Sequence, residues 1–151
     1  MTAPKQVTLV MTEEQAKVLR TALDVYWRIG LGDLGEVASL IARQHAPMPL
    51  RQWTMVRESL EAIKADVFGL APNATHGIFS EEKVPAGARE VYDIVQVLRR
   101  ALAKARWEEE EAARPPEERG GWKMDADFHD YLPAHPEWPP VEVRVVTLPA
   151  D

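Results

Sequence analysis

Apolar residues recur every three or four positions through the first two thirds of the chain, which is the spacing of amphipathic helices. The pattern predicts a first helix that begins after Thr12, because Thr12 and Gln15 are placed to form a capping box. Gly30 and Gly32 end this helix. Its expected buried face consists of Val18, Leu19, Ala22, Leu23, Tyr26 and Ile29.

Three further helices follow from the same periodicity. A short second helix begins after Gly32-Asp33 and stops before Pro47 and Pro49, because proline interrupts a helix. A third runs from about Leu50 to Phe68, with Trp53, Val56, Leu60, Ile63 and Val67 as its expected buried stripe. The last begins near Pro85, after a loop of some fifteen residues, and has its apolar side at Val91, Ile94, Val95, Leu98, Leu102 and Ala105.

The two ends of the chain show the alternating pattern of strands instead. Polar and apolar residues alternate over Gln6–Val10 and again over Val141–Thr147. We therefore predict one α+β domain spanning residues 1–151, with about four helices packed on a small, mainly antiparallel sheet formed by the N- and C-terminal strands.

Charge is unevenly distributed between the two parts of the chain. Residues 1–104 hold 13 basic against 12 acidic residues, whereas residues 105–151 hold 5 against 12. We expect the last helix to fray within Glu108–Glu111, because four like charges repel one another and oppose the helix dipole. Residues 108–140 are then an acidic, proline-rich irregular segment. The net charge of −6 argues against duplex nucleic acid as a binding partner of this chain.

Several classes of protein are excluded by what the sequence lacks. The absence of cysteine excludes disulfides, zinc–thiolate sites and cysteine nucleophiles. Without an apolar leader or a membrane-spanning stretch, we expect a cytoplasmic protein with no membrane partner. Long amphipathic helices on a small sheet leave apolar surface uncovered, so we predict a homo-oligomer that associates through the first and last helices.

The end of the first helix is the first candidate binding site. Trp27 and Arg28 flank the predicted core positions and precede a glycine turn. An indole and a guanidinium together suit a nucleotide, since one stacks on a base and the other binds phosphate. Alternatively, Trp27 packs under the turn and Arg28 binds carbonyl groups at the helix end.

A second candidate is the loop before the last helix, where Asn73, His76 and Phe79 lie close together in sequence, just ahead of a helix N-terminus that favours anions. The alternative is a structural loop anchored in the core by Ile78 and Phe79.

The polar side of the last helix is a third candidate. It carries Arg89, Tyr92, Gln96, Arg99 and Arg100, of which Tyr92, Gln96 and Arg99/Arg100 share one face through their spacing. The arginines are suited to hold a phosphate. The alternative is that they pair with Glu90 and Asp93.

Residues 125–130 present Asp125, Asp127 and His129 as potential metal ligands, but they lack the fixed spacing of a calcium loop, so solvated loop carboxylates are the better interpretation. We expect no metal, no cofactor and no catalytic residue, because no catalytic motif is present.

Four segments resemble small phage proteins of the first family of Thoeris anti-defence proteins: Ala22–Gly32, Gly77-Ile78, Val84-Pro85 and Ala88–Arg99. Proteins of this family are non-enzymatic sponges that capture cyclic ADP-ribose-type signals made by bacterial TIR-domain enzymes. The resemblance implies an α+β protomer assembled into dimers or larger rings such as hexamers, in the cytoplasm of the host cell. The family's pocket uses two arginines, an asparagine and a base-stacking aromatic residue.

By resemblance, Arg28 and Arg99 match the two arginines and Phe79 the stacking aromatic residue, whereas the asparagine has no clear match, since Asn73 lies too early. The resemblance implies sequestration of a nucleotide immune second messenger, of the cyclic ADP-ribose type or a cyclic oligonucleotide, which blocks host anti-phage signalling. Two alternatives stay open: a protein–protein inhibitor that docks on a host protein through its acidic C-terminal third, and a small hydrolase using His76 or Asp125, Asp127 and His129.

Overall fold

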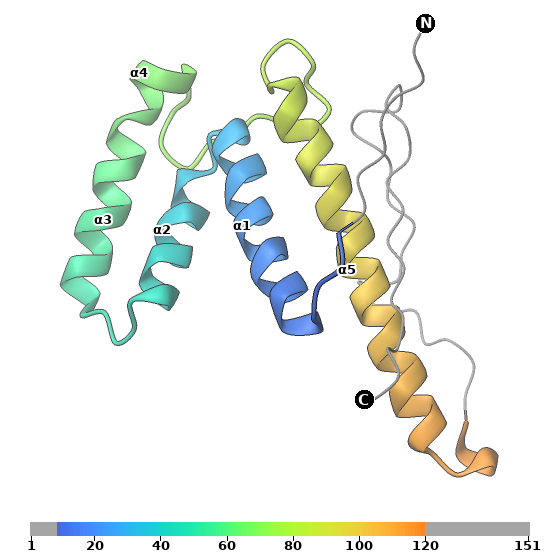
Figure 1. The fold of residues 1–151 in the computed structure, drawn as a ribbon. Coiled ribbons are helices and arrows are strands. Elements are labelled where there is room, and N and C mark those ends of the chain that lie inside the picture. Colours follow the sequence, from blue (N-terminus) through green and yellow to red (C-terminus); the bar gives the residue numbers. More distant parts are fainter. Residues whose placement is uncertain (1–8, 120–151) are drawn as a thin grey trace, which may run out of the picture.

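A computed structural model describes residues 9–119, and helix is the only regular secondary structure among them (Figure 1). The helices are α1 (Glu13–Leu31), α2 (Leu34–Gln44), α3 (Leu50–Ala62), α4 (Lys64–Phe68) and α5 (Ala86–Ala113), followed by the 3-10 helix η1 (Pro116–Glu118). Within residues 9–119, no helix combines the length and the apolar character needed to cross a membrane.

The expected α+β fold is wrong for this part of the chain. Leu9 and Val10, the last residues of the first predicted strand, form no strand and are 69% and 80% exposed. A short strand is stable only when its apolar side chains pack against other strands or a helix. Leu9 and Val10 have no such packing. Residues 6–8 and the second predicted strand, 141–147, lie outside the described residues.

The predicted ends of α1 are confirmed. The Thr12 hydroxyl accepts from the Gln15 amide and the Gln15 side chain accepts from the Thr12 amide, which completes the capping box. Gly32 takes the left-handed conformation, with φ of 72°, where a side chain would be strained. Asp33 then caps α2 by accepting from the Glu36 amide. The chain therefore turns from α1 into α2 within two residues.

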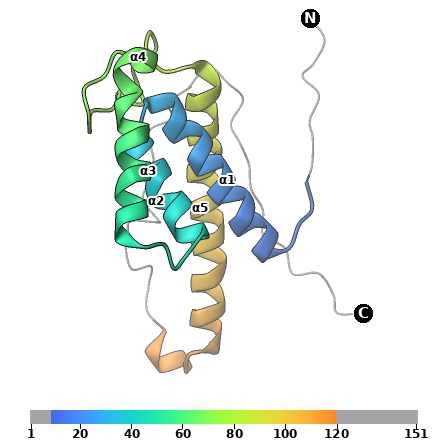
Figure 2. The same ribbon diagram turned by 90° about the vertical axis from the view of Figure 1, so that its left-hand side faces the viewer.

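The helices form one layer, in the order α3, α2, α1, α5, and α5 extends well beyond the others (Figures 1 and 2). α1 packs along α5, and α2 lies between α1 and α3. A core cluster of Leu31, Val84 and Ala88 joins α1 to the start of α5, and Trp27 and Ile78 pack against it. The end of α1 and the first turn of α5 are thus held together by a packed apolar cluster.

The contact between α1 and α5 is closest at Gly30. A Cβ atom at this position would lie 2.3 Å from the Cβ of Ala88, far inside van der Waals contact. Two small residues therefore let the backbones approach, and the side chains on either side of them meet as a result.

The predicted buried faces of α1 and α3 are partly wrong. Val18, Tyr26 and Ile29 are 70%, 56% and 44% exposed, because α1 meets α5 through the side that carries Ala16, Trp27 and Leu31. The third helix also divides at Ile63 into α3 and α4, and no residue of α3 is fully buried. Ile63 and Val67 are 46% and 62% exposed. Periodicity identifies the apolar side of a helix, but it does not identify which element packs against the helix.

The expected fraying of the last helix at Glu108–Glu111 is also wrong, since α5 continues to Ala113. Glutamate and alanine are good helix formers. Lys104 also pairs with Glu108 at 3.6 Å, one helical turn apart, and Arg114 binds Glu111 at 2.6 Å. These opposite charges offset the repulsion within the acidic run. Residues 120–140 of the predicted irregular segment lie outside the described residues.

A buried ion pair fixes the α3–α4 junction to the loop that follows. Lys64 is 1% exposed, and its ammonium lies 3.0 Å from the Glu61 carboxylate, which also accepts from the Asn73 amide at 2.7 Å. Burial raises the pKa of Glu61, but the hydrogen bonds from Asn73 and Lys64 outweigh it and lower the pKa below its ordinary value of 4.5.

We predict that Gly30→Ala lowers the free energy of unfolding by about 1–3 kcal/mol, because the new methyl group overpacks against Ala88. Gly77→Ala is the control, since a Cβ at Gly77 meets no atom within 4 Å. Chemical denaturation of both variants measures the difference. Equal stability of the two variants would contradict the close packing of α1 on α5.

Glu61→Gln should lower the free energy of unfolding near pH 7 by about 1–3 kcal/mol, because it leaves the Lys64 ammonium buried without a counter-charge. Since the pKa of Glu61 is lowered by folding, its contribution is present above 4.5 and is lost as the pH falls through the folded value. The difference from wild type should therefore shrink toward about pH 3 in urea titrations. The exposed Glu58→Gln on the same helix should show no such difference.

Candidate anion-binding site

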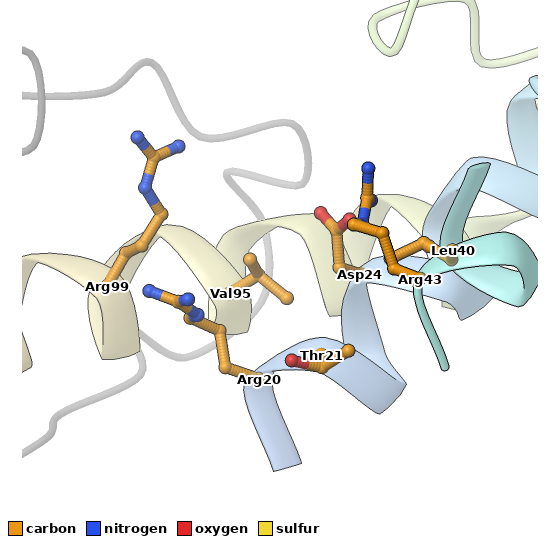
Figure 3. A pocket seen from close by; sticks show the side chains of 7 residues that line it. All are labelled: Arg20, Thr21, Asp24, Leu40, Arg43, Val95 and Arg99. Carbon is orange, nitrogen blue, oxygen red and sulfur yellow. The ribbon is translucent and has the colours of Figure 1, made fainter. Parts of the chain in front are cut away.

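A hollow of about 490 Å³ opens where α1, α2 and α5 meet (Figure 3). This volume is within the range of small-molecule sites in proteins, roughly 300–1,000 Å³. The residues that line it are Arg20, Thr21, Asp24, Leu40, Arg43, Val95 and Arg99. We call it the arginine hollow, because three of its seven lining residues are arginines.

Each of these arginines comes from a different helix: Arg20 from α1, Arg43 from α2 and Arg99 from α5. Figure 3 shows Arg20 and Arg99 on one side of Val95 and Arg43 on the other, beside Asp24. Arg43 pairs with Glu36 at 2.8 Å. Among residues 9–119, Arg20 forms no hydrogen bond or ion pair with another side chain. The hollow therefore offers guanidinium donors from several directions.

Asp24 is the one carboxylate in the hollow, and its two oxygens are already engaged. One accepts from the Trp27 indole at 3.0 Å and the other from Arg28 Nε at 2.9 Å. Both oxygens of Asp24 therefore already accept hydrogen bonds inside the protein, and Asp24 shares the charge of Arg28 with Asp33. Of the three arginines that line the hollow, Arg43 is paired with Glu36, whereas Arg20 has no such partner among residues 9–119.

Arg28, a predicted phosphate ligand, lies outside the arginine hollow in an internal network. Its Nη1 donates to Asp33 at 2.8 Å, and its guanidinium lies 4.6 Å from the centre of the Trp27 ring. Burial lowers the pKa of Arg28, but the hydrogen bonds to Asp24 and Asp33 outweigh it and raise the pKa. These contacts tie the end of α1 to the N-cap of α2. Arg28 therefore has a structural role, as in the alternative considered from the sequence. Its partners, however, are the carboxylates of Asp24 and Asp33 and not the carbonyl groups at the helix end.

Trp27 and Tyr92 pack against each other edge to face, with ring centres 5.3 Å apart. Burial and the nearby Asp93 raise the pKa of the Tyr92 phenol, while the positive charge of Arg99 acts in the opposite direction. Of the predicted residues on this side of α5, Arg99 lines the hollow, whereas Tyr92 and Gln96 are half-buried outside its lining.

The loop candidate is held by contacts within the protein. Asn73 has a positive φ of 61°, and its side chain accepts from Arg57 at 3.0 Å. The His76 amide donates to the Leu31 carbonyl at 2.9 Å, and Ile78 packs on the core cluster. Phe79 is 53% exposed. None of Asn73, His76 and Phe79 lines the arginine hollow, so the structure does not bring the predicted clamp and stacking residue together.

The sequence pattern did not single out Arg20 or Arg43, which both line the hollow. The position of Arg20 on α1 offered one signal. Arg20 lies four residues before Asp24, on the polar side of α1 and opposite Tyr26. Nothing in the local pattern places Arg43, because its position depends on how α2 folds back beside α1.

Two groups remain from the sequence analysis, His76 and the potential metal ligands of residues 125–130. No group of three or more potential metal ligands occurs among residues 9–119. Over the same range, the His76 side chain has no hydrogen-bonded partner that would orient it as a base. Asp125, Asp127 and His129 lie outside the described residues.

Comparison of the chain with protein-family models, with curated proteins and with solved structures yields no match.

We predict that Arg28→Ala lowers the free energy of unfolding by about 1–3 kcal/mol, because Asp24 and Asp33 lose a charged hydrogen-bond partner. Arg51→Ala, at an exposed site on α3, should stay within about 0.5 kcal/mol of wild type. Thermal and urea unfolding followed by circular dichroism provide the measurement. An Arg28→Ala protein as stable as Arg51→Ala would mean that this network contributes nothing to the fold.

Proposed function

We propose that this protein binds a phosphate-bearing small molecule of the nucleotide class in the arginine hollow and retains it unchanged. The observation that carries the proposal is the convergence of Arg20, Arg43 and Arg99 from three helices on one hollow of ligand size. Arginine binds phosphate through paired, charge-assisted hydrogen bonds, and its planar guanidinium matches the geometry of phosphate oxygens.

Electrostatics favours an anion at this position. Arg20 has no hydrogen-bonded or ion-paired side-chain partner among residues 9–119, so an anion in the hollow gains its attraction directly, together with that of Arg43, which is shared with Glu36, and of Arg99. Asp24 does not supply this anion, because Trp27 and Arg28 already use its oxygens. A ligand that binds only the folded protein also stabilises it, and the size of that stabilisation reports the affinity.

Retention without turnover is supported by the chemistry of the lining. Its polar groups are guanidinium groups, the Thr21 hydroxyl and the engaged Asp24 carboxylate. Phosphoester hydrolysis requires an activated nucleophile or a metal-bound water. No histidine lines the hollow, and the part of the chain that the structure describes has no cluster of metal ligands.

A protein that binds a nucleotide signal without converting it lowers the free concentration of that signal. This is the role that the resemblance to anti-Thoeris sponges implies. We propose that this chain acts in this way in the cytoplasm of an infected cell. The helical fold of residues 9–119 differs from the α+β fold implied by that resemblance, so the proposal depends on the arginine hollow.

The geometry changes which residues we assign to the ligand. Arg99 keeps its predicted role, and Arg20 and Arg43 join it, whereas Arg28 supports the fold. Phe79 is exposed but lies outside the hollow's lining. We therefore expect recognition of phosphate in the hollow and little dependence on stacking against Phe79.

The test is calorimetry of cyclic ADP-ribose, its isomers and cyclic dinucleotides against wild type, Arg20→Ala and Arg99→Ala. A charge-assisted hydrogen bond contributes about 1.5–3 kcal/mol, so each variant should bind roughly 10- to 100-fold more weakly. Arg51→Ala serves as the control, because it removes an exposed arginine that does not line the hollow and should leave affinity unchanged.

Mass spectrometry of ligand recovered after proteolysis separates sequestration from catalysis: intact ligand supports the proposal, and a hydrolysed product overturns it. Absence of nucleotide binding by wild type below about 100 μM would also overturn it. Equal loss of affinity in Arg51→Ala would indicate non-specific charge attraction. The competing role of a protein inhibitor acting through the acidic C-terminal third concerns mainly residues outside the described range.

A further inference from the structure

The arginine hollow presents its positive charges at two ends, with an apolar residue between them. Figure 3 shows Arg20 and Arg99 on one side of Val95 and Arg43 on the other. Val95 is 2% exposed, and the second apolar residue of the lining, Leu40, is 8% exposed. The positive charges of the hollow are therefore arranged as two separate groups.

Arg20 and Arg99 form one end, because they lie at the same level of two neighbouring helices. α1 and α5 run in opposite directions, since the end of α1 meets the start of α5 where Gly30 approaches Ala88. Arg20 precedes Gly30 by ten residues, and Arg99 follows Ala88 by eleven. At the helical rise of 1.5 Å per residue, both lie about 15–17 Å from this contact. We call this the Arg20–Arg99 end.

Arg43 forms the other end, because its side chain extends along α2 away from that level. Its Nη2 lies 2.8 Å from the carboxylate of Glu36, which is seven residues earlier in the same helix. Seven residues correspond to about 10 Å along the axis, in the direction of the turn at Gly32. Arg20 lies twelve residues before this turn, or about 18 Å along α1. We call the region around this guanidinium the Arg43 end.

We propose that the arginine hollow binds a nucleotide whose two phosphate groups are separated by its sugar. Arg20 and Arg99 bind the first phosphate, Arg43 binds the second, and the nucleoside lies over Val95. This inference rests on the proposed function, because it specifies the ligand of the same hollow. It adds the arrangement of the phosphates in that ligand.

A nucleotide with two adjacent phosphates matches this arrangement less well. Its charges are concentrated in one part of the molecule, and each guanidinium binds phosphate only through hydrogen bonds of about 2.7–2.9 Å. A diphosphate held by Arg20 and Arg99 therefore presents no charged acceptor to Arg43. Two phosphates separated by a sugar engage both ends of the hollow, and they place the less polar nucleoside over Val95.

Glu36 competes with the second phosphate at the Arg43 end. The side chains of Arg43 and Glu36 are 60% and 34% exposed, so water screens their ion pair and weakens it. A phosphate monoester carries close to two negative charges near neutral pH, so it can displace this single carboxylate from Arg43. The charge of Glu36 also repels the incoming phosphate. Glu36 therefore lowers affinity for the second phosphate and does not affect the first.

Calorimetry with three nucleotides of the same nucleoside is the first measurement. AMP has one phosphate, ADP has two adjacent phosphates, and adenosine 3′,5′-bisphosphate has two that the ribose separates. ADP and the bisphosphate each carry two phosphate groups, so a difference between their affinities reports the arrangement of the charges. Wild type should bind the bisphosphate about 10-fold more tightly than ADP, because it makes one further charge-assisted contact.

Arg43→Ala should reduce the affinity for the bisphosphate to about that for AMP. AMP binding should stay unchanged in this variant, because AMP occupies the Arg20–Arg99 end. Arg51→Ala is the control, since it removes an exposed arginine that does not line the hollow. Circular dichroism establishes that each variant is folded.

Glu36→Gln should strengthen binding of the bisphosphate about 2- to 5-fold, which is the range of an exposed ion pair, and should leave AMP binding unchanged. Glu58→Gln is the matched control, because it removes an exposed glutamate of α3 outside the hollow's lining. A gain in affinity is not produced by a loss of folded protein, so this variant tests the proposal independently of Arg43→Ala.

Three results would overturn the two-ended arrangement and leave the proposed function intact. They are equal affinity of wild type for ADP and the bisphosphate, an equal loss of AMP and bisphosphate binding in Arg43→Ala, and unchanged bisphosphate binding in Glu36→Gln. In each case, weaker nucleotide binding by Arg20→Ala and Arg99→Ala would still support a phosphate site in the hollow. Failure of wild type to bind any nucleotide would overturn both proposals.

Discussion

The close approach of Gly30 and Ala88 is the constraint on which the rest of the described structure depends. A side chain at Gly30 would meet the Ala88 Cβ at 2.3 Å, so only two small residues allow α1 and α5 to pack at this distance. The approach brings Leu31, Val84 and Ala88 into one cluster and sets Trp27 against Tyr92. It also fixes which side of α1 faces α5, and therefore which sides face α2 and solvent.

Fixing α1 in this way gives its surface two sides of different character. Arg20 and Asp24 line the arginine hollow, together with Arg43 of α2 and Arg99 of α5. The exposed apolar residues Val18, Tyr26 and Ile29 lie on the opposite side of the helix. The proposed ligand site is therefore separate from the exposed apolar side of α1.

Two ion-pair networks tie neighbouring elements of the described structure together. Arg28 links Asp24 on α1 to Asp33 at the cap of α2, and Glu61 links Lys64 to the loop at Asn73. α3 has no fully buried residue, so its attachment depends on α2 and on this second network. Arg28 and Glu61 thus support the fold, and the proposed binding role falls to the arginines that line the hollow.

The sequence by itself determined the local features of the described residues: the capping box at Thr12, the left-handed turn at Gly32 and the start of α5 after Pro85. These depend on neighbours within a few residues, so a local pattern contains them. Only the tertiary structure decided that Val18, Tyr26 and Ile29 face outward, that α5 continues through Glu108–Glu111, and that Arg20 and Arg43 join Arg99. The physical reason is that helical periodicity identifies the apolar side of a helix, whereas burial and the meeting of charges depend on which helices lie beside it.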